Sequence, residues 1–143
     1  MADKKLIKEM LENGLNQLKE TRIVVGALIK CSKTGRVLLL LRNDPKPVWA
    51  MMSGTVEKGE DLLTALKREM YEEMFFKGEG MSFKSIGVEH FPAKNLEFHY
   101  FEGFCETEFK PILDQENLEF GWFSKDKLPS PLFKGVAEKI ANI

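Results

Sequence analysis

A glycine and five charged residues stand at fixed offsets near the middle of the chain: Gly54, Glu60, Arg68, Glu69, Glu72 and Glu73. Because each residue type makes up about 7% or less of an average protein, this match arises by chance on the order of once in 10⁵ chains. Residues 60–74 lack glycine and proline and are rich in helix-forming residues, so the sequence predicts a helix with Asp61 near its start.

The acidic residues of this expected helix border its apolar side, which is formed by Leu62, Leu63, Ala65, Leu66, Met70 and Met74. Glu69, Glu72 and Glu73 are related by spacings of three and four residues, so they form one arc. A solvated acidic face would lie opposite the apolar stripe, whereas these carboxylates are expected to be half-buried. Like charges in that position repel and lose hydration, a cost that a hard cation such as Mg²⁺ relieves. The helix is therefore a candidate metal site.

Mixed charge on a helix has a simpler interpretation, which is an exposed surface with ion pairs between residues four apart. Three carboxylates alone would favour that interpretation. The complete pattern, with Gly54 before the helix and Arg68 within it, argues against it.

Residues 54–76 resemble the signature of the Nudix hydrolases, which cleave nucleoside diphosphates linked to another moiety. Every charged position of that signature is present. The late glycine of the family is replaced by Phe75, which puts the geometry of the helix end in question. The run Trp-x-x-Pro-Gly-Gly that often precedes the signature reads differently at residues 49–54, so the loop backbone can be set differently.

The resemblance implies roles for the residues of the signature. It implies that Mg²⁺, with Mn²⁺ as the alternative ion, is held by Glu69, Glu72, Glu73 and a backbone carbonyl near Ser53. It also implies that Arg68 orients the carboxylates by pairing with one of them. Gly54 and Glu60 would then support the ligands from outside the metal shell.

The implied reaction is hydrolysis of a diphosphate bond by a water that the metal acidifies, while Glu116 or Glu73 takes the proton. Residues 116–123 resemble a family element in which an acidic loop leads into an aromatic strand. Glu116 is therefore ranked above Glu119 and Asp114 as general base or extra ligand. The alternative is a solvated loop carboxylate without a catalytic role.

The moiety attached to the diphosphate is less constrained. Pro92 stands near the position of a proline in relatives that hydrolyse ADP-ribose, although one proline is more often a turn residue. ADP-ribose-like or dinucleotide substrates are therefore favoured over nucleoside triphosphates. Arg42 and Trp49 are further candidates for substrate binding. The alternative function is a catalytically weak nucleotide-binding Nudix module that acts as a sensor or regulator, but such a module would typically have lost one or more of the glutamates.

Length and composition predict a single domain over residues 1–143, because 43% hydrophobic residues in 143 can build one sizeable core. A net charge of −1 gives no reason to expect binding to nucleic acid or membranes, and a monomer and a homodimer both stay open. No signal peptide or transmembrane run is recognised. Cys31 and Cys105 lie in apolar runs without the spacing of a metal site or a disulfide pair, so reduced thiols and a cytoplasmic location are expected.

The order of the expected elements indicates an α/β protein. An amphipathic helix is expected over residues 3–19, within an N-terminal extension of residues 1–20. Strands are expected over residues 22–30, 36–42, 83–91, 96–107 and 119–123, and a last helix from Ser130-Pro131 to Ile140. Together with the resemblance, which covers roughly residues 22–140, these elements predict a Nudix-type α/β/α sandwich with a mixed β-sheet and a catalytic helix after a loop.

Overall fold

The computed structural model of the chain describes residues 4, 5, 7, 8 and 21–143. Strand β1 (Arg22–Cys31) runs through the middle of the sheet, and most of its residues are buried. It pairs in parallel with β6 (Leu96–Cys105) along its whole length and antiparallel with two other strands. A strand buried on both faces reads as a continuous apolar run, as residues 22–31 do. The predicted helix over residues 3–19 and the extension 1–20 lie almost entirely outside the described residues.

The sheet is mixed and has seven strands in the order β3-β2-β1-β6-β5, with β4 paired to β1 and β7 paired to β2. The remaining strands are β2 (Val37–Arg42), β3 (Trp49–Ala50), β4 (Met52–Thr55), β5 (Ser82–Phe91) and β7 (Asn117–Phe123). Strands β1 and β2 pair only next to their connecting turn, and farther along β4 pairs with β1 while β3 pairs with β2. Strands β3 and β4, which lead into the signature, thus pair with the two strands β2 and β1 near the middle of the sheet.

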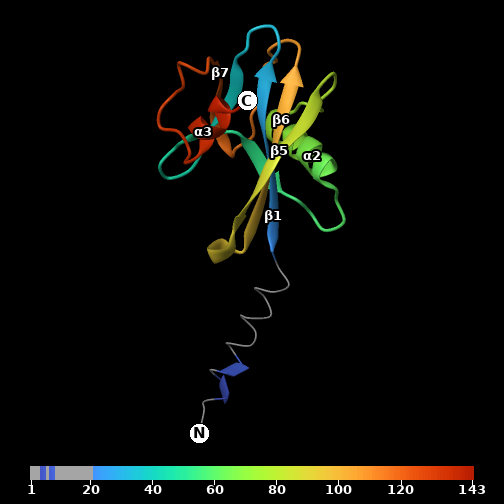
Figure 1. Cartoon of the computed structure of the whole chain (residues 1–143), viewed down its shortest axis with the longest axis vertical. Coiled ribbons are helices and arrows are strands. Elements are labelled where there is room, and N and C mark those ends of the chain that lie inside the picture. Colours follow the sequence, from blue (N-terminus) through green and yellow to red (C-terminus); the bar gives the residue numbers. More distant parts are fainter. Residues whose placement is uncertain (1–3, 6, 9–20) are drawn as a thin grey trace.

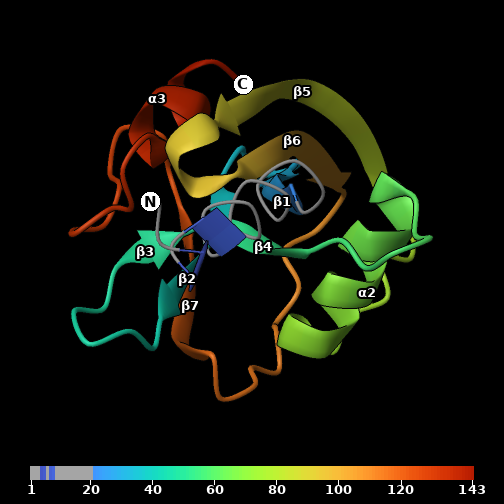
Figure 2. The same ribbon diagram turned by 90° about the horizontal axis from the view of Figure 1, so that it is seen from below.

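Helices α2 (Leu62–Met74) and α3 (Val136–Ala141) lie on opposite sides of the strands (Figure 1, Figure 2). The α2 side contains one core, which includes Val25, Ala27, Ile29, Leu38, Leu40, Leu66, Met70 and Met74. The α3 side contains a second core, which includes Leu28, Val37, Leu39, Tyr100, Val136 and Ile140. Alternate residues of β1 and β2 enter opposite cores, because successive side chains of a strand point to opposite faces. The predicted α/β/α sandwich is confirmed.

The start of the last helix was predicted wrongly. Helix α3 begins at Val136 rather than at Pro131. The segment before it is used as an edge partner of β3: the N–H of Trp49 donates to the carbonyl of Pro131, and the N–H of Phe133 donates to the carbonyl of Trp49. Backbone groups that pair with a strand are not free for a helical turn, so tertiary pairing overrides the local start signal.

Candidate active site

The start of helix α2 is set by its own sequence. Asp61 is the N-cap, and its Oδ1 accepts a hydrogen bond of 2.8 Å from the N–H of Thr64. In the loop before it, a carboxylate oxygen of Glu60 accepts a 2.8 Å bond from the N–H of Glu57. The Asp61 side chain satisfies a backbone donor that the start of an α-helix leaves without a partner, and the Glu60 side chain satisfies a backbone donor of the loop. The loop and the first turn are therefore held in one arrangement.

The end of helix α2 keeps the geometry expected of a glycine although Phe75 stands there. Phe75 is in the left-handed conformation (φ 53°, ψ 38°), and its N–H donates to the carbonyl of Tyr71 at 2.9 Å. Its ring is exposed and stacks on the ring of Tyr71 at 5.1 Å between centroids. A non-glycine residue is strained in this conformation. The replacement of the signature glycine by Phe75 therefore costs energy at the end of helix α2, but the backbone still follows the course expected of a glycine.

Gly54 leaves room for the side chain of Glu69 against strand β4. A Cβ atom at this position would lie 1.9 Å from the carboxyl carbon of Glu69, so the Glu69 side chain would have to move. Gly54 pairs with Val25 of the central strand, and Ser53 is the residue directly before it. The glycine of the signature thus makes room for one of its glutamates, beside the backbone of Ser53.

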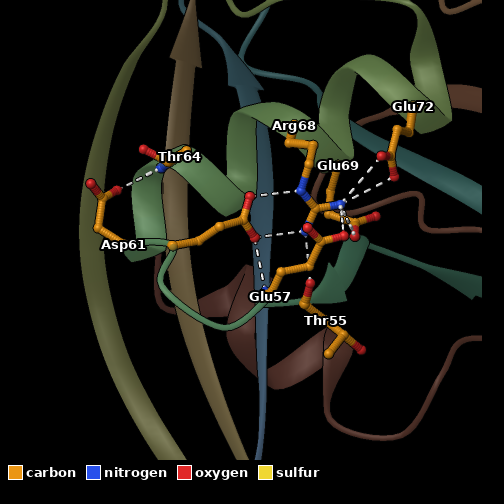
Figure 3. A network of polar contacts seen from close by, with 8 residues as sticks. Thr55, Glu57, Asp61, Thr64, Arg68, Glu69 and Glu72 are labelled. Atoms are coloured by element: carbon orange, nitrogen blue, oxygen red, sulfur yellow. Dashed lines mark hydrogen bonds and ion pairs between the residues drawn. The ribbon is translucent and has the colours of Figure 1, made fainter.

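Arg68 holds the loop and the helix together (Figure 3). Its guanidinium donates two bonds of 2.8 and 2.9 Å to the carboxylate of Glu60 and one of 2.9 Å to the carbonyl of Thr55. It also contacts Glu69 at 3.0 Å and Glu72 at 3.2 Å. The bonds from Arg68 lower the pKa of Glu60 to about 2, so Glu60 stays ionised as a partner of Arg68.

Glu73 is the most unusual residue of the site. It is only 6% exposed, and its Oε2 atom has no hydrogen-bond partner. Burial, together with the charges of Glu69, Glu116 and Asp114, raises the pKa of Glu73 to about 8. The amide of Asn117 acts in the opposite direction but only weakly, since its Nδ2 atom makes no well-formed hydrogen bond. Without a cation, this carboxyl is therefore expected to hold a proton at neutral pH.

The other two glutamates of the arc differ in exposure. The side chain of Glu69 is 13% exposed, whereas that of Glu72 is 53% exposed. Burial raises the pKa of Glu69, Arg68 opposes this shift, and the charges of Glu72 and Glu116 add to it. The prediction of half-buried carboxylates holds for Glu69, but Glu73 is more buried and Glu72 more exposed than expected.

The structure brings the segment before strand β7 to the acidic face of α2. The carbonyl of Glu116 accepts a 2.9 Å bond from the N–H of Asn43, and its N–H donates to Asp114 at 3.0 Å. Glu116 and Asp114 are close enough to act on the pKa of Glu73. Glu119 pairs instead with Leu41 within the sheet and is not among the charges that act on Glu73. The ranking of Glu116 above Glu119 agrees with this placement, whereas Asp114 lies closer to the site than its rank suggested.

Asn117 is a residue of this site that the sequence interpretation missed. It is buried, and it lies beside the carboxyl of Glu73. Its signal in the sequence was its position directly after Glu116 at the start of the aromatic strand. An open depression of about 490 Å³ adjoins the same segment and is lined by Pro111, Leu113, Leu118, Glu119 and Phe120.

The three candidates for substrate binding lie in different places. Arg42 ends strand β2 opposite Asn117, and its Nε atom contacts Asp44 at 2.8 Å. Trp49 packs edge-on against Phe123 in the core on the α3 side. Pro92 begins the short helix η1 (Pro92–Lys94), which closes the hairpin of β5 and β6. Only Arg42 is thereby placed beside the segment that carries Glu116.

The fit of the site to a cation rests on its oxygen donors. Within residues 4, 5, 7, 8 and 21–143, no three Asp, Glu, His or Cys side chains form a ready-made cation site, and Arg68 contacts both Glu69 and Glu72. The donor set nevertheless suits a hard divalent ion, because Glu73 offers an unpaired buried oxygen close to Glu69. A bound cation would neutralise the repulsion between these two carboxylates and so remove the main energetic cost of placing them together.

Comparison with known proteins identifies the family. The family model described as NUDIX domain matches residues 20–142. The chain belongs to the Nudix family. It is a Nudix pyrophosphohydrolase; hydrolases of this family act on small nucleotide-derived substrates and generally need a divalent metal.

Individual relatives agree with this assignment. The chain is 32% identical over 126 residues to a dihydroneopterin triphosphate diphosphatase of Haemophilus influenzae, covering 78% of each chain. The structure of the dihydroneopterin triphosphate pyrophosphohydrolase of E. coli matches with a TM-score of 0.65 at 21% identity, over 85% of this chain and 93% of that one. A C. elegans Ap4A hydrolase matches with a TM-score of 0.60 at 22% identity, over 84% and 86%. These structures share the fold of this Nudix protein. Among its described residues, none of the helices is long and apolar enough to cross a membrane.

Proposed function

We propose that this Nudix protein hydrolyses the diphosphate bond of a small nucleotide-like substrate with the help of Mg²⁺, for which Mn²⁺ can substitute. The observation that carries the proposal is the buried carboxyl of Glu73, which has an unpaired oxygen and three acidic neighbours. A fold gains nothing from placing such a group there, because an uncompensated buried charge costs several kcal/mol or takes up a proton. A cation bound between the carboxylates would compensate this buried negative charge.

Glu69, Glu72, Glu73 and the backbone carbonyl of Ser53 would hold the ion. Once bound, the ion supplies positive charge that neutralises the phosphate oxygens and acidifies a water molecule. Glu72 is the most exposed of the three glutamates, so its side chain can turn from Arg68 toward an incoming ion at little cost. Arg68 keeps its bonds to Glu60 and the loop, and so fixes the helix during that change.

Glu116 is proposed as the general base, with Glu73 as the second candidate. Glu116 is exposed to solvent and lies close enough to Glu69 and Glu73 to raise the pKa of both. An exposed carboxylate at the edge of the site can take a proton from the attacking water and pass it to solvent. Glu73 is buried and is better suited to hold the ion. Gly54 and Glu60 have supporting roles, since one makes room for Glu69 and the other anchors Arg68.

For the substrate we place triphosphates of a nucleoside or pterin type first, which would release pyrophosphate. This choice is supported by the relative from Haemophilus influenzae, whose name gives dihydroneopterin triphosphate as its substrate. The depression that adjoins the segment before strand β7 includes the apolar side chains of Leu113, Leu118 and Phe120, which offer a surface for a flat ring system. ADP-ribose-like and dinucleotide substrates, favoured by the position of Pro92, are the second candidates. Arg42 is proposed to contact the phosphates, because it lies beside the same segment.

The cellular location and the partners that we propose follow from the type of substrate. Small nucleotide-like phosphates are metabolites of the cytoplasm, and we propose that the protein acts there without stable nucleic-acid or membrane partners. Its net charge of −1 provides no electrostatic attraction to either polyanion. Gel filtration decides whether the protein is a monomer or a homodimer.

A substrate panel tests the proposal. Purified protein with Mg²⁺ is assayed on dihydroneopterin triphosphate, nucleoside triphosphates, ADP-ribose and a diadenosine polyphosphate, and the phosphorus-containing products are identified. We expect turnover that is lost in EDTA and in Glu73→Gln, with Glu138→Gln, at an exposed glutamate of helix α3 on the opposite side of the sheet, as the control of unchanged rate. Release of pyrophosphate indicates a triphosphate substrate, two monophosphate products indicate ADP-ribose, and a nucleoside monophosphate together with a nucleoside polyphosphate indicates the diadenosine polyphosphate. Tight binding of a non-hydrolysable analogue without turnover of any substrate would favour the sensor instead.

A further inference from the structure

The two cysteines of the chain lie side by side, although 73 residues separate them in the sequence. Cys31 ends strand β1 and Cys105 ends strand β6, and the two residues are register partners in the last pair of the parallel ladder. Both are buried, and both point into the core on the α2 side. The Cys105 thiol donates to the carbonyl of Lys30, the residue before Cys31, at 3.7 Å, and Cys31 is close enough to raise the pKa of Cys105. The sequence alone gave no sign of this pairing.

The placement suits a covalent bond between the two sulfurs. Adjacent strands lie about 4.8 Å apart, and a disulfide needs a Cα separation of roughly 4.4–6.8 Å. The pair stands at the end of the ladder, where only one neighbouring register pair restrains the backbone. Immediately after it, the N–H of Ser32 donates to the carbonyl of Cys105 at 2.8 Å, so the two chains stay together beyond the cysteines.

We propose that Cys31 and Cys105 form a reversible intramolecular disulfide when the protein meets hydrogen peroxide. The Cys31 thiolate attacks one peroxide oxygen, the O–O bond breaks, and the other oxygen leaves as water after taking up a proton. Cys105 then attacks the sulfur of the Cys31 sulfenic acid, and a second water leaves. Two thiols are oxidised, one peroxide is reduced, and a dithiol reductant reverses the reaction.

The environments of the two sulfurs assign the order of these steps. Burial alone would raise the pKa of the Cys31 thiol, but hydrogen bonds from the Thr34 hydroxyl and the backbone N–H groups of Thr34 and Lys33 outweigh it and lower the pKa. Burial raises the pKa of Cys105 to about 11, and the neighbouring Cys31 adds to this shift. The thiolate is the reactive form of cysteine. Cys31 is therefore the attacking residue and Cys105 the resolving one.

A small oxidant can reach the pair because only a thin layer covers it. The residues of the adjacent turn, Ser32, Lys33 and Thr34, are exposed, and so is Glu106 on the other strand. The carbonyl of Glu106 accepts a hydrogen bond of 3.3 Å from the Cys31 thiol, so this buried sulfur contacts the backbone of an exposed residue. Peroxide is scarcely larger than water, so movement of this turn alone admits it.

Intact-mass analysis tests the proposal on the full chain. The protein is treated with a few equivalents of peroxide, unfolded in N-ethylmaleimide and weighed. We expect a product that is lighter by two hydrogen atoms and takes up no label, and we expect dithiothreitol to restore both labelling sites. The variants Cys31→Ser and Cys105→Ser separate the steps: dimedone should trap a sulfenic acid at Cys31 in the Cys105→Ser protein far faster than at Cys105 in the Cys31→Ser protein.

Three results would overturn the proposal, and each is visible in the unmutated protein. They are oxygen adducts without the loss of two hydrogen atoms, disulfide-linked dimers in place of the internal bond, and labelling sites that disappear one at a time. Faster trapping at Cys105 than at Cys31 would overturn the assigned order. Because the main measurement uses the unmutated chain, a serine variant that fails to fold does not prevent the test.

Discussion

Replacing Glu73 by glutamine is expected to stabilise the metal-free protein while it removes activity. The side chain keeps its shape, but it can no longer ionise. In the native protein burial raises the pKa of Glu73 from its ordinary 4.5 to about 8. Between these two pH values the native state holds a proton that the unfolded state has released, so the stability of the wild type falls as the pH rises through this window. The glutamine variant cannot ionise at this position, so its stability does not fall for this reason.

The size of the effect follows from the two pKa values. With 1.36 kcal/mol for each pH unit, ionising Glu73 costs the fold at most about 5 kcal/mol above pH 8. Movement of the carboxylate toward water reduces this figure, so a gain of roughly 2–4 kcal/mol is expected for the variant at pH 9. At pH 5, where the wild-type carboxyl is protonated, the two proteins should be about equally stable.

Urea denaturation in EDTA at pH 5, 7 and 9 measures this difference. Glu138→Gln is the matched control, because Glu138 is exposed on helix α3 on the opposite side of the sheet, and its stability relative to the wild type should not change with pH in the same way. A glutamine variant no more stable than the wild type at pH 9, or a difference independent of pH, would refute the reasoning. The same variant should lose turnover by several orders of magnitude, so wild-type activity would contradict the metal-site assignment.

Three further predictions concern the ion, the base and the helix end. Millimolar Mg²⁺ should raise the melting temperature of the wild type by binding the native state, and less so in Glu69→Gln; a flat titration of the wild type would contradict the cation site. Glu116→Gln should lower kcat by about 10²–10⁴-fold with little change in KM, and partial rescue by Mn²⁺ would instead make Glu116 a ligand. Phe75→Gly should be about 1 kcal/mol more stable than Phe75→Ala in urea denaturation, because both lose the ring but only glycine relieves the left-handed backbone; equal stabilities would show that the strain is absent.

Features that depend on nearby residues were determined by the sequence. The helix of the signature begins and ends within two residues of its predicted limits, since its N-cap and periodicity are local properties. Strands β1, β2, β5 and β6, which form two antiparallel pairs, were predicted for the same reason. The spacing of Glu69 and Glu73 on one helix already required that they face the same way.

Features that depend on contacts between distant segments were decided only by the tertiary structure. The approach of Glu116 and Asn117 to Glu73 requires the turn of chain before β7 to cross to helix α2. The late start of α3 and the meeting of Cys31 with Cys105 depend on which strands lie side by side. A local pattern fixes the direction of a side chain within its own helix or strand, but the pairing of strands fixes its neighbours, and the pKa of Glu73 is set by those neighbours and by burial.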